Sequence, residues 1–456
     1  MAHKSRQFLR IVGAAVLASG SATAYADFQR GLAAYETGDY AAAFAEWLPA
    51  AEMGELGAMY NVGLLYDYGL GVAQDKQAAI RWYTGPALEG NVSAQFNIAT
   101  IYDYGDGVPE DDGEAVRWYT AAARQADEQA QFNLGVMYAS GEGVEVDHAE
   151  SRYWYRMSAD LGYAPSQYNL GYIYDTGIDV AEDNAAALGW YERAAAAGDA
   201  DALYAMALMF DAGDGVAEDD AKALRLYERA AGAGHVKAQF NLAVMYDTGE
   251  GVAENDAHAA VFYEKAALQG HVGAQVNLGI MCERGEGRAV DTAEAMRWYN
   301  MAAEQGSAEA QYALGLMYDE GKGVAEDNTE AITWYRRAAD QGDADAQNNL
   351  GAMFDLGEGI AEDNAEALRW YTLAANQGNA VAQNNLGAMY FAGEGAAQSK
   401  IEAYKWFYIA ESLGSEVGRQ NRQISSGSMA RSEIAQAEAL ALAWLDAHER
   451  GGGEAP

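Results

Sequence analysis

Two series of side chains recur at a fixed spacing, and they carry most of the chemistry that the sequence offers. The first is an acid ladder, made up of Asp67, Asp103, Asp175, Asp211, Asp247, Glu283, Asp319 and Asp355. The second is an aromatic stripe, seven residues before the ladder position, made up of Phe96, Phe132, Tyr168, Tyr204, Phe240 and Tyr312. Carboxylates attract cationic groups, and aromatic rings provide flat apolar contacts. Together they predict a binding surface for basic peptide segments, with sugars as the alternative ligand.

Catalytic chemistry has no comparable signature. The chain contains no S-x-x-K, G-x-S-x-G or H-E-x-x-H sequence, no Walker A loop and no G-x-G-x-x-G motif. The ladder carboxylates occupy one repeating position, and no part of the chain holds a singular carboxylate pair of the kind that hydrolyses glycosides. We therefore expect no catalytic residues and predict that the protein is not an enzyme.

Metal ions and cofactors are not expected either. His235 and His271 share one position in successive units, where other units carry acids or amides, so turn chemistry explains them better than metal ligation. Acidic loops such as Asp211–Asp220 lack the residue order of a hand-type calcium loop, although calcium binding there stays open. Cys282 is the only cysteine, which excludes an intrachain disulfide.

The elements that must position these side chains repeat with a period of 36 residues. The glutamine of an Ala-Gln pair marks that period at Gln95, Gln131, Gln167, Gln239, Gln275, Gln311, Gln347 and Gln383. A glycine series from Gly69 to Gly393 keeps the same period without a break. Ten units therefore run from Ala58 to Ser415 with no insertion or deletion.

Each unit predicts a pair of helices. Apolar residues at helical spacing from Ala94 to Tyr102 form the buried side of a first helix, which Gly105 ends in a left-handed conformation. Asp111 and Glu114 form a capping box that begins the second helix, around Trp118. One such hairpin cannot bury its apolar face, so neighbours must stack. We predict an all-α, right-handed α-solenoid of ten helix-turn-helix repeats with capping units at both ends.

The repeated text resembles a known family. The pattern A-Q-x-N-L-G-x-M-Y-x-x-G-x-G-V, followed by D-x-x-x-A-x-x-W-Y, is similar to the Sel1-like repeat of the tetratricopeptide superfamily, and Ala238–Gly270 matches it almost throughout. Gly31–Gly54 resembles the shorter tetratricopeptide-like unit that often begins such chains. The resemblance implies a scaffold for partner proteins in bacterial envelope signalling, exopolysaccharide regulation or host contact.

Local departures from the pattern affect single turns. Asp179 replaces the second loop glycine of its unit, and Ala126 interrupts the glycine series that ends the second helices. Gly85-Pro86 predicts an interruption in the second helix of the first full unit, because proline removes a helical hydrogen bond.

The N-terminus predicts export. Three basic residues lie in the first ten, Ile11–Gly20 is a short apolar run, and Ala24-Tyr25-Ala26 is an A-x-A cleavage signal. We expect cleavage after Ala26 and a periplasmic or secreted protein without membrane insertion. The expected organisation is a signal peptide at 1–26, an N-terminal capping unit at 27–57, ten repeats at 58–415, a linker (416–429) and C-terminal capping helix within 416–450, and a disordered tail at 451–456.

The formal net charge of −39 limits the possible partners. Such a field repels nucleic acid and anionic lipid headgroups and favours cationic partners. Solubility or adaptation to a salty habitat would explain the same acidity without any partner. The oligomeric state leaves no sequence signature.

Two functions follow from these observations. The first is an exported, non-enzymatic scaffold that binds a protein or peptide, preferably a basic one, along the inner face of the solenoid. The second is a protein that binds or processes cell-wall material or polysaccharide. A purely structural explanation competes with both, in which the stripe packs against adjacent helices and the acids only solvate the rim. An acid in the last turn of a helix costs about 0.3–1 kcal/mol, so the ladder requires some reason.

Overall fold

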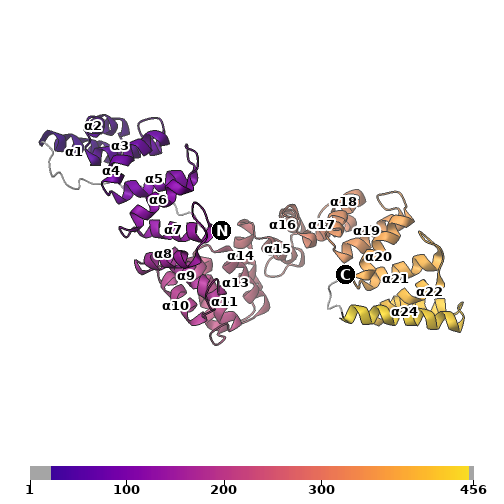
Figure 1. Cartoon of the computed structure of the whole chain (residues 1–456). Helices are drawn as coiled ribbons and strands as arrows, with labels where there is room; N and C mark the ends of the chain where they lie inside the picture. Colours follow the sequence, from indigo (N-terminus) through magenta and orange to yellow (C-terminus); the bar gives the residue numbers. More distant parts are fainter. Residues whose placement is uncertain (1–21, 451–456) are drawn as a thin grey trace. The chain divides into compact units, whose positions relative to one another are not determined.

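The computed structural model describes residues 22–450, with side chains from 27 to 448. This part of the chain is entirely helical and contains 24 helices that follow one another in pairs (Figure 1). It forms two compact units, one ending at Ala233 and the other beginning at Gly234. The prediction of an all-α, solenoid-like fold built from ten helix-turn-helix repeats is confirmed.

In each repeat the first helix is called helix A and the second helix B. The A helices are α3 (Leu56–Tyr68), α5 (Val92–Tyr104), α7 (Glu128–Ser140), α9 (Ala164–Thr176), α11 (Ala200–Ala212), α13 (Val236–Thr248), α15 (Val272–Arg284), α17 (Ala308–Glu320), α19 (Ala344–Leu356) and α21 (Ala380–Ala392). The B helices are α4 (Lys76–Leu88), α6 (Asp112–Ala123), α8 (His148–Asp160), α10 (Asn184–Ala196), α12 (Asp220–Gly232), α14 (Asp256–Leu268), α16 (Thr292–Glu304), α18 (Asn328–Asp340), α20 (Asn364–Asn376) and α22 (Lys400–Ser412).

The ends of the helices follow the expected chemistry with one exception. Gly105 ends α5 at a φ of 59°, and the Asp111 carboxylate accepts the backbone N–H of Glu114 at 3.0 Å. The reciprocal half of the capping box does not form, because the Asp111 N–H donates to the carbonyl of Tyr102 at 3.1 Å instead. This bond ties the start of helix B to the last turns of helix A, and it fixes the loop between them.

The core of each repeat is built around the tyrosine of helix B. Tyr191, for example, is 1% exposed and lies against Gly171 of helix A. A Cβ at Gly171 would come within 2.5 Å of the Tyr191 ring, so the missing side chain is what lets the ring pack there.

The repeating glutamine joins one repeat to the next. Gln275 is fully buried and donates through Nε2 to the carbonyl of Ala267 at 3.0 Å, in the last turn of the preceding helix B. Its Oε1 accepts from Gln305, which follows helix B of the same repeat, at 2.9 Å. Because helix ends leave carbonyls without intrahelical donors, this side chain satisfies a group that stacking would otherwise bury unpaired.

The structure differs from the sequence expectations in two places. Residues 416–426, expected as a linker, form helix α23 (Glu416–Ser426), so that prediction is wrong there. The reason is that Ser415 continues the N-cap series of the A helices and accepts the N–H of Gly418 at 3.1 Å. The interruption expected at Gly85-Pro86 is also absent, since α4 continues through both residues.

Helices outside the ten repeats cover both ends. At the N-terminal end, α1 (Ala22–Glu36) and α2 (Tyr40–Glu52) pack together, and the Trp47 indole donates to the carbonyl of Phe28 at 3.2 Å. At the other end, α24 (Arg431–Arg450) packs on α22 through Trp444, whose ring lies 5.9 Å from that of Trp406. Most of the predicted signal peptide (1–21) and the tail (451–456) lie outside the described residues.

Candidate functional site

The acid ladder lies at the C-terminal turn of the A helices, and each of its members accepts a hydrogen bond from the buried tyrosine of helix B. The pairs are Tyr83–Asp67 (3.0 Å), Tyr119–Asp103 (3.1 Å), Tyr191–Asp175 (3.1 Å), Tyr227–Asp211 (3.0 Å), Tyr263–Asp247 (3.1 Å), Tyr299–Glu283 (3.2 Å), Tyr335–Asp319 (3.0 Å) and Tyr371–Asp355 (3.5 Å). Every pair spans 16 residues of sequence. The ladder therefore has a structural task that its position in the helix alone does not indicate.

The hydroxyl of the pair remains a donor at all moderate pH values. Burial raises the pKa of Tyr119 well above its usual value, and the negative charge of Asp103 raises it further. A buried hydroxyl left without an acceptor costs about 1–3 kcal/mol, which exceeds the cost of an acid near a helix C-terminus. The bond thus supplies the reason that the acid ladder requires.

The aromatic stripe packs on helix B tyrosines, and five of its six rings contact a tyrosine that binds a ladder acid. Each ring of the stripe lies beside the tyrosine of its own repeat, with centroids between 5.6 Å for Phe96–Tyr119 and 5.9 Å for Tyr312–Tyr335. Phe132 is buried, whereas the other five rings are half-buried. The stripe is therefore partly a packing surface, as the structural explanation proposes, and partly open to solvent.

The helix B tyrosines were missed as members of this site. In five repeats they bring the ladder and the stripe together, because one ring contacts a stripe residue while its hydroxyl binds the acid. The sequence does carry a signal, since the last repeat has Phe407 in place of the tyrosine and Phe391 in place of the acid. The two positions change together when the hydroxyl is lost.

Few of the ladder acids are neutralised within the protein. Lys76 lies between Asp67 and Asp106, at 2.7 Å and 2.6 Å, and Lys322 lies 3.8 Å from Glu283. Within the part of the chain that the structure describes, five half-buried acids form no ion pair at all: Asp175, Asp211, Asp247, Asp319 and Asp355.

Nearby negative charges further disfavour the ionised form of two of these carboxylates. Burial raises the pKa of Asp175, the hydrogen bond from Tyr191 lowers it, and the nearby charges of Asp214 and Glu182 raise it again. Burial and the charges of Glu394 and Glu362 likewise raise the pKa of Asp355. A cation placed beside either carboxylate would relieve this repulsion.

The histidines and the cysteine have packing and capping roles. His235 and His271 cap α13 and α15, and the Nδ1 of each accepts a backbone N–H at 3.1 Å. Burial lowers the pKa of His271, whose ring stacks on Phe240 with centroids 4.3 Å apart. Cys282 is fully buried. Among the described residues, no group of three or more His, Cys, Asp or Glu is placed to hold a metal ion.

Membrane-spanning helices are not found in residues 22–450, where every helix is too short or too polar to cross a bilayer.

A known family of repeats matches the chain with the same 36-residue period. The Sel1 repeat family matches at residues 57–84, 92–127, 128–163, 164–199, 200–235, 236–271, 272–307, 308–343, 344–379 and 380–415. The chain is 33% identical to c5321, a protective antigen present in uropathogenic Escherichia coli strains that displays an SLR fold, with 95% of each chain covered and a TM-score of 0.74. It is also 33% identical to a Sel1 repeat protein from Oxalobacter formigenes, with 67% of this chain and 88% of that chain covered and a TM-score of 0.53. No match was found among curated proteins.

Proposed function

Because the chain belongs to the Sel1 repeat family, whose helical scaffolds typically bind other proteins, we propose that it is an exported, non-enzymatic scaffold for a partner with basic segments. The observation that carries this proposal is the set of five half-buried ladder acids without an ion pair in the described part of the chain. Their tyrosine bonds use one carboxylate oxygen, which leaves the negative charge to a ligand.

The first full repeat shows how a cation would be held. There the ammonium group of Lys76 is bonded to the ladder acid Asp67 and to Asp106 of the next repeat, and it lies 5.8 Å from the ring centroid of Tyr68. The repeat of α9 has the same two acids in Asp175 and Asp214, but Asn184 stands where Lys76 stands. A lysine or arginine from a partner would supply the missing positive charge beside Asp175.

Export and the cellular role are parts of the same proposal. The predicted signal peptide supports a periplasmic or secreted location. The similar Escherichia coli protein is a protective antigen, which supports host contact among the roles that the family resemblance implies. Envelope signalling and exopolysaccharide regulation are the other two.

A basic peptide tests the binding proposal directly. We would measure the fluorescence anisotropy of a labelled lysine-rich peptide with the mature chain, at about 50 mM and about 300 mM salt. The variant with Asp175→Asn, Asp211→Asn and Asp247→Asn removes three charges but keeps an oxygen that can accept each tyrosine bond. We expect it to bind the peptide about tenfold more weakly than the wild type at low salt.

The matched control removes the same charge from elsewhere. Glu192→Gln, Glu228→Gln and Glu304→Gln change three exposed residues on helix B, away from the ladder. If this control weakens binding as much as the ladder variant, the attraction comes from the overall charge and the ladder is not the site. Retention of a polysaccharide in place of the peptide would favour the alternative function.

A further inference from the structure

The third repeat lacks its ladder acid but keeps the tyrosine. Ala139 occupies the ladder position in α7, while Tyr155 still occupies the tyrosine position in α8. The last repeat shows that the two normally disappear together, since Phe391 stands in the same repeat as Phe407. The third repeat therefore retains a buried hydroxyl after losing the carboxylate that every other such hydroxyl binds.

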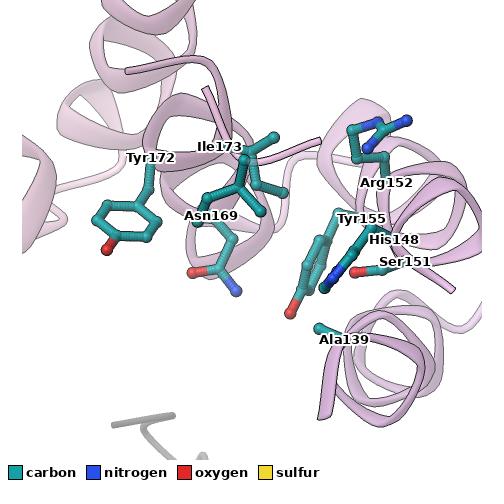
Figure 2. A pocket seen from close by; sticks show the side chains of 9 residues that line it. Ala139, His148, Ser151, Arg152, Tyr155, Asn169, Tyr172 and Ile173 are labelled. Carbon is teal, nitrogen blue, oxygen red and sulfur yellow. The ribbon is translucent and has the colours of Figure 1, made fainter. Parts of the chain in front are cut away.

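A pocket fills the place of the missing acid. Its volume is about 310 Å³, and Figure 2 shows that side chains of α8 line one side, that Asn169, Tyr172 and Ile173 of α9 line the other, and that Ala139 closes one end. The hydroxyl of Tyr155 and the amide of Asn169 point toward each other. Pockets of roughly 300 Å³ lie at the lower end of the range for small ligands.

The third repeat also carries a basic side chain that its neighbours lack. The position of Arg152 is apolar in the neighbouring repeats, where Val116 and Leu188 occupy it. Arg152 lines the pocket, and its Nη1 is buried without a hydrogen-bond partner. Within the described residues Arg152 forms no ion pair, although the protein carries a formal charge of −39. A buried guanidinium nitrogen without an acceptor costs free energy, which an anionic ligand would recover.

Tyr155 provides a second donor suited to an oxygen acceptor. Burial raises the pKa of Tyr155 to about 12, although hydrogen bonds with Asn169 and Ser151 lower it, so the hydroxyl is protonated at neutral pH. His148 stands where Lys76 stands in the first repeat, and Lys76 binds a ladder carboxylate. The repeat thus presents donors around a cavity from which the usual acceptor has been removed.

We propose that the pocket between α7, α8 and α9 binds a carboxylate group on a small apolar body. The carboxylate takes the place of the absent ladder acid and accepts hydrogen bonds from Tyr155 and Arg152, and the apolar body lies against Tyr172 and Ile173. This site differs from the ladder in the charge of its ligand, and it does not depend on the proposed binding of basic segments.

Ligand-observed NMR with the full mature chain tests the proposal. Phenylacetate is the probe, and phenylacetamide is the matched neutral molecule. We expect phenylacetate to bind, and phenylacetamide to bind at least about tenfold more weakly, because the amide lacks the charge that Arg152 requires. A tripeptide ending in phenylalanine, with a free or an amidated C-terminus, shows whether the pocket also accepts the end of a polypeptide.

Two variants locate the binding. Ala139→Asp supplies the missing acid from within the chain, so it should abolish phenylacetate binding while keeping or raising the thermal midpoint. Arg152→Leu installs the residue of the next repeat and should weaken binding at least about tenfold. As a control, Asp175→Ala in the Ala139→Asp background opens a gap beside Tyr191 without a guanidinium, and no binding should return.

The proposal fails under any of three results. The first is that neither phenylacetate nor the free-acid tripeptide binds the wild type. The second is that the amides bind as tightly as the acids. The third is that the Ala139→Asp variant binds phenylacetate as tightly as the wild type does. None of these results would affect the peptide measurement on the ladder variants, so the two proposals are separable.

Discussion

At the scale of single residues, a buried tyrosine hydroxyl needs an acceptor, because an unsatisfied polar group costs about 1–3 kcal/mol. In eight repeats that acceptor is the acid sixteen residues earlier, as in Tyr191 and Asp175 at 3.1 Å. The acid therefore acts first on stability, and its remaining charge is what a partner would use. Structure and binding are two consequences of one carboxylate.

A double-mutant cycle on this pair separates the hydrogen bond from simple packing. Asp175→Ala leaves the Tyr191 hydroxyl without its acceptor and should lower the free energy of unfolding by about 1–3 kcal/mol. Tyr191→Phe in the same chain removes the hydroxyl and should recover most of that loss. The last repeat likewise lacks both groups, since it has Phe391 and Phe407 at these two positions. Urea unfolding followed by circular dichroism measures both changes. Additive effects of the two substitutions would contradict a direct interaction.

Ala126 offers a second test at this scale. Its φ is 64°, in the left-handed region, where the other repeats have glycine. A side chain in that conformation costs about 1–2 kcal/mol, so Ala126→Gly should stabilise the protein by about 1 kcal/mol after the entropic cost of glycine is subtracted. The thermal midpoint checks this, and Ala121→Gly within α6 should lower it. A lower midpoint for Ala126→Gly would mean that the turn is not strained.

At the scale of helices, the repeating glutamines determine how one repeat follows another. Gln275 bonds the end of α14 and receives a bond from Gln305. Where the donor of the second bond is missing, the acceptor remains alone: Gln131 Oε1 is buried without a partner, and Leu161 occupies the donor position. Each missing donor therefore leaves a buried acceptor unpaired between the two helices of one repeat.

Restoring one of these donors should raise the free energy of unfolding. Leu161 is 52% exposed, so replacing it sacrifices little buried apolar area. Leu161→Gln should bond Gln131 and raise the free energy of unfolding by about 1 kcal/mol. Gln305→Leu makes the reverse change in another repeat and should lower it by a similar amount. If the denaturant midpoints of the two variants shift in the same direction, the bond between the two glutamines does not contribute to stability.

The sequence indicates the helices well because their signals are local. Gly105 and Asp111 mark a helix end and a helix start by their own conformational preferences, so the residue pattern alone suffices to place the repeats. The bond between Tyr191 and Asp175 was not predicted, because it depends on how two helices rotate against each other. The pocket at Ala139 was missed for a related reason, since a cavity arises from a side chain that is absent.

At the scale of the whole molecule, acidic residues far outnumber basic ones and the formal charge is −39. Self-repulsion of this kind lowers the stability of the compact state and is reduced by salt. Not every acid contributes equally. The pKa of Asp67, Asp175 and Asp355 is raised, chiefly by burial, whereas pairing with Arg419 lowers that of the exposed Glu416 to about 2.

Neutralising Asp175 and Asp355 should stabilise the protein at neutral pH and not at acid pH. The native pKa values of Asp175 and Asp355 are raised above 3.8, so the native state holds these protons more tightly than the unfolded state. Stability therefore falls as the pH rises through the interval above 3.8, and the full penalty is present at neutral pH. Asp175→Asn with Asp355→Asn removes that penalty while an amide oxygen can still accept each tyrosine bond.

We expect the double variant to unfold at a higher urea concentration than the wild type at pH 7, by about 0.3–1 kcal/mol for each site. The difference should shrink as the pH falls and vanish below 3.8, where these carboxyls are protonated in both the native and the unfolded state. The lowered pKa of His271 acts in the opposite sense below 6.5, but it is common to both proteins and cancels in their difference. A variant that is less stable than the wild type at pH 7 would show that the ladder charge itself stabilises the fold, and binding of a cationic partner would then need another explanation.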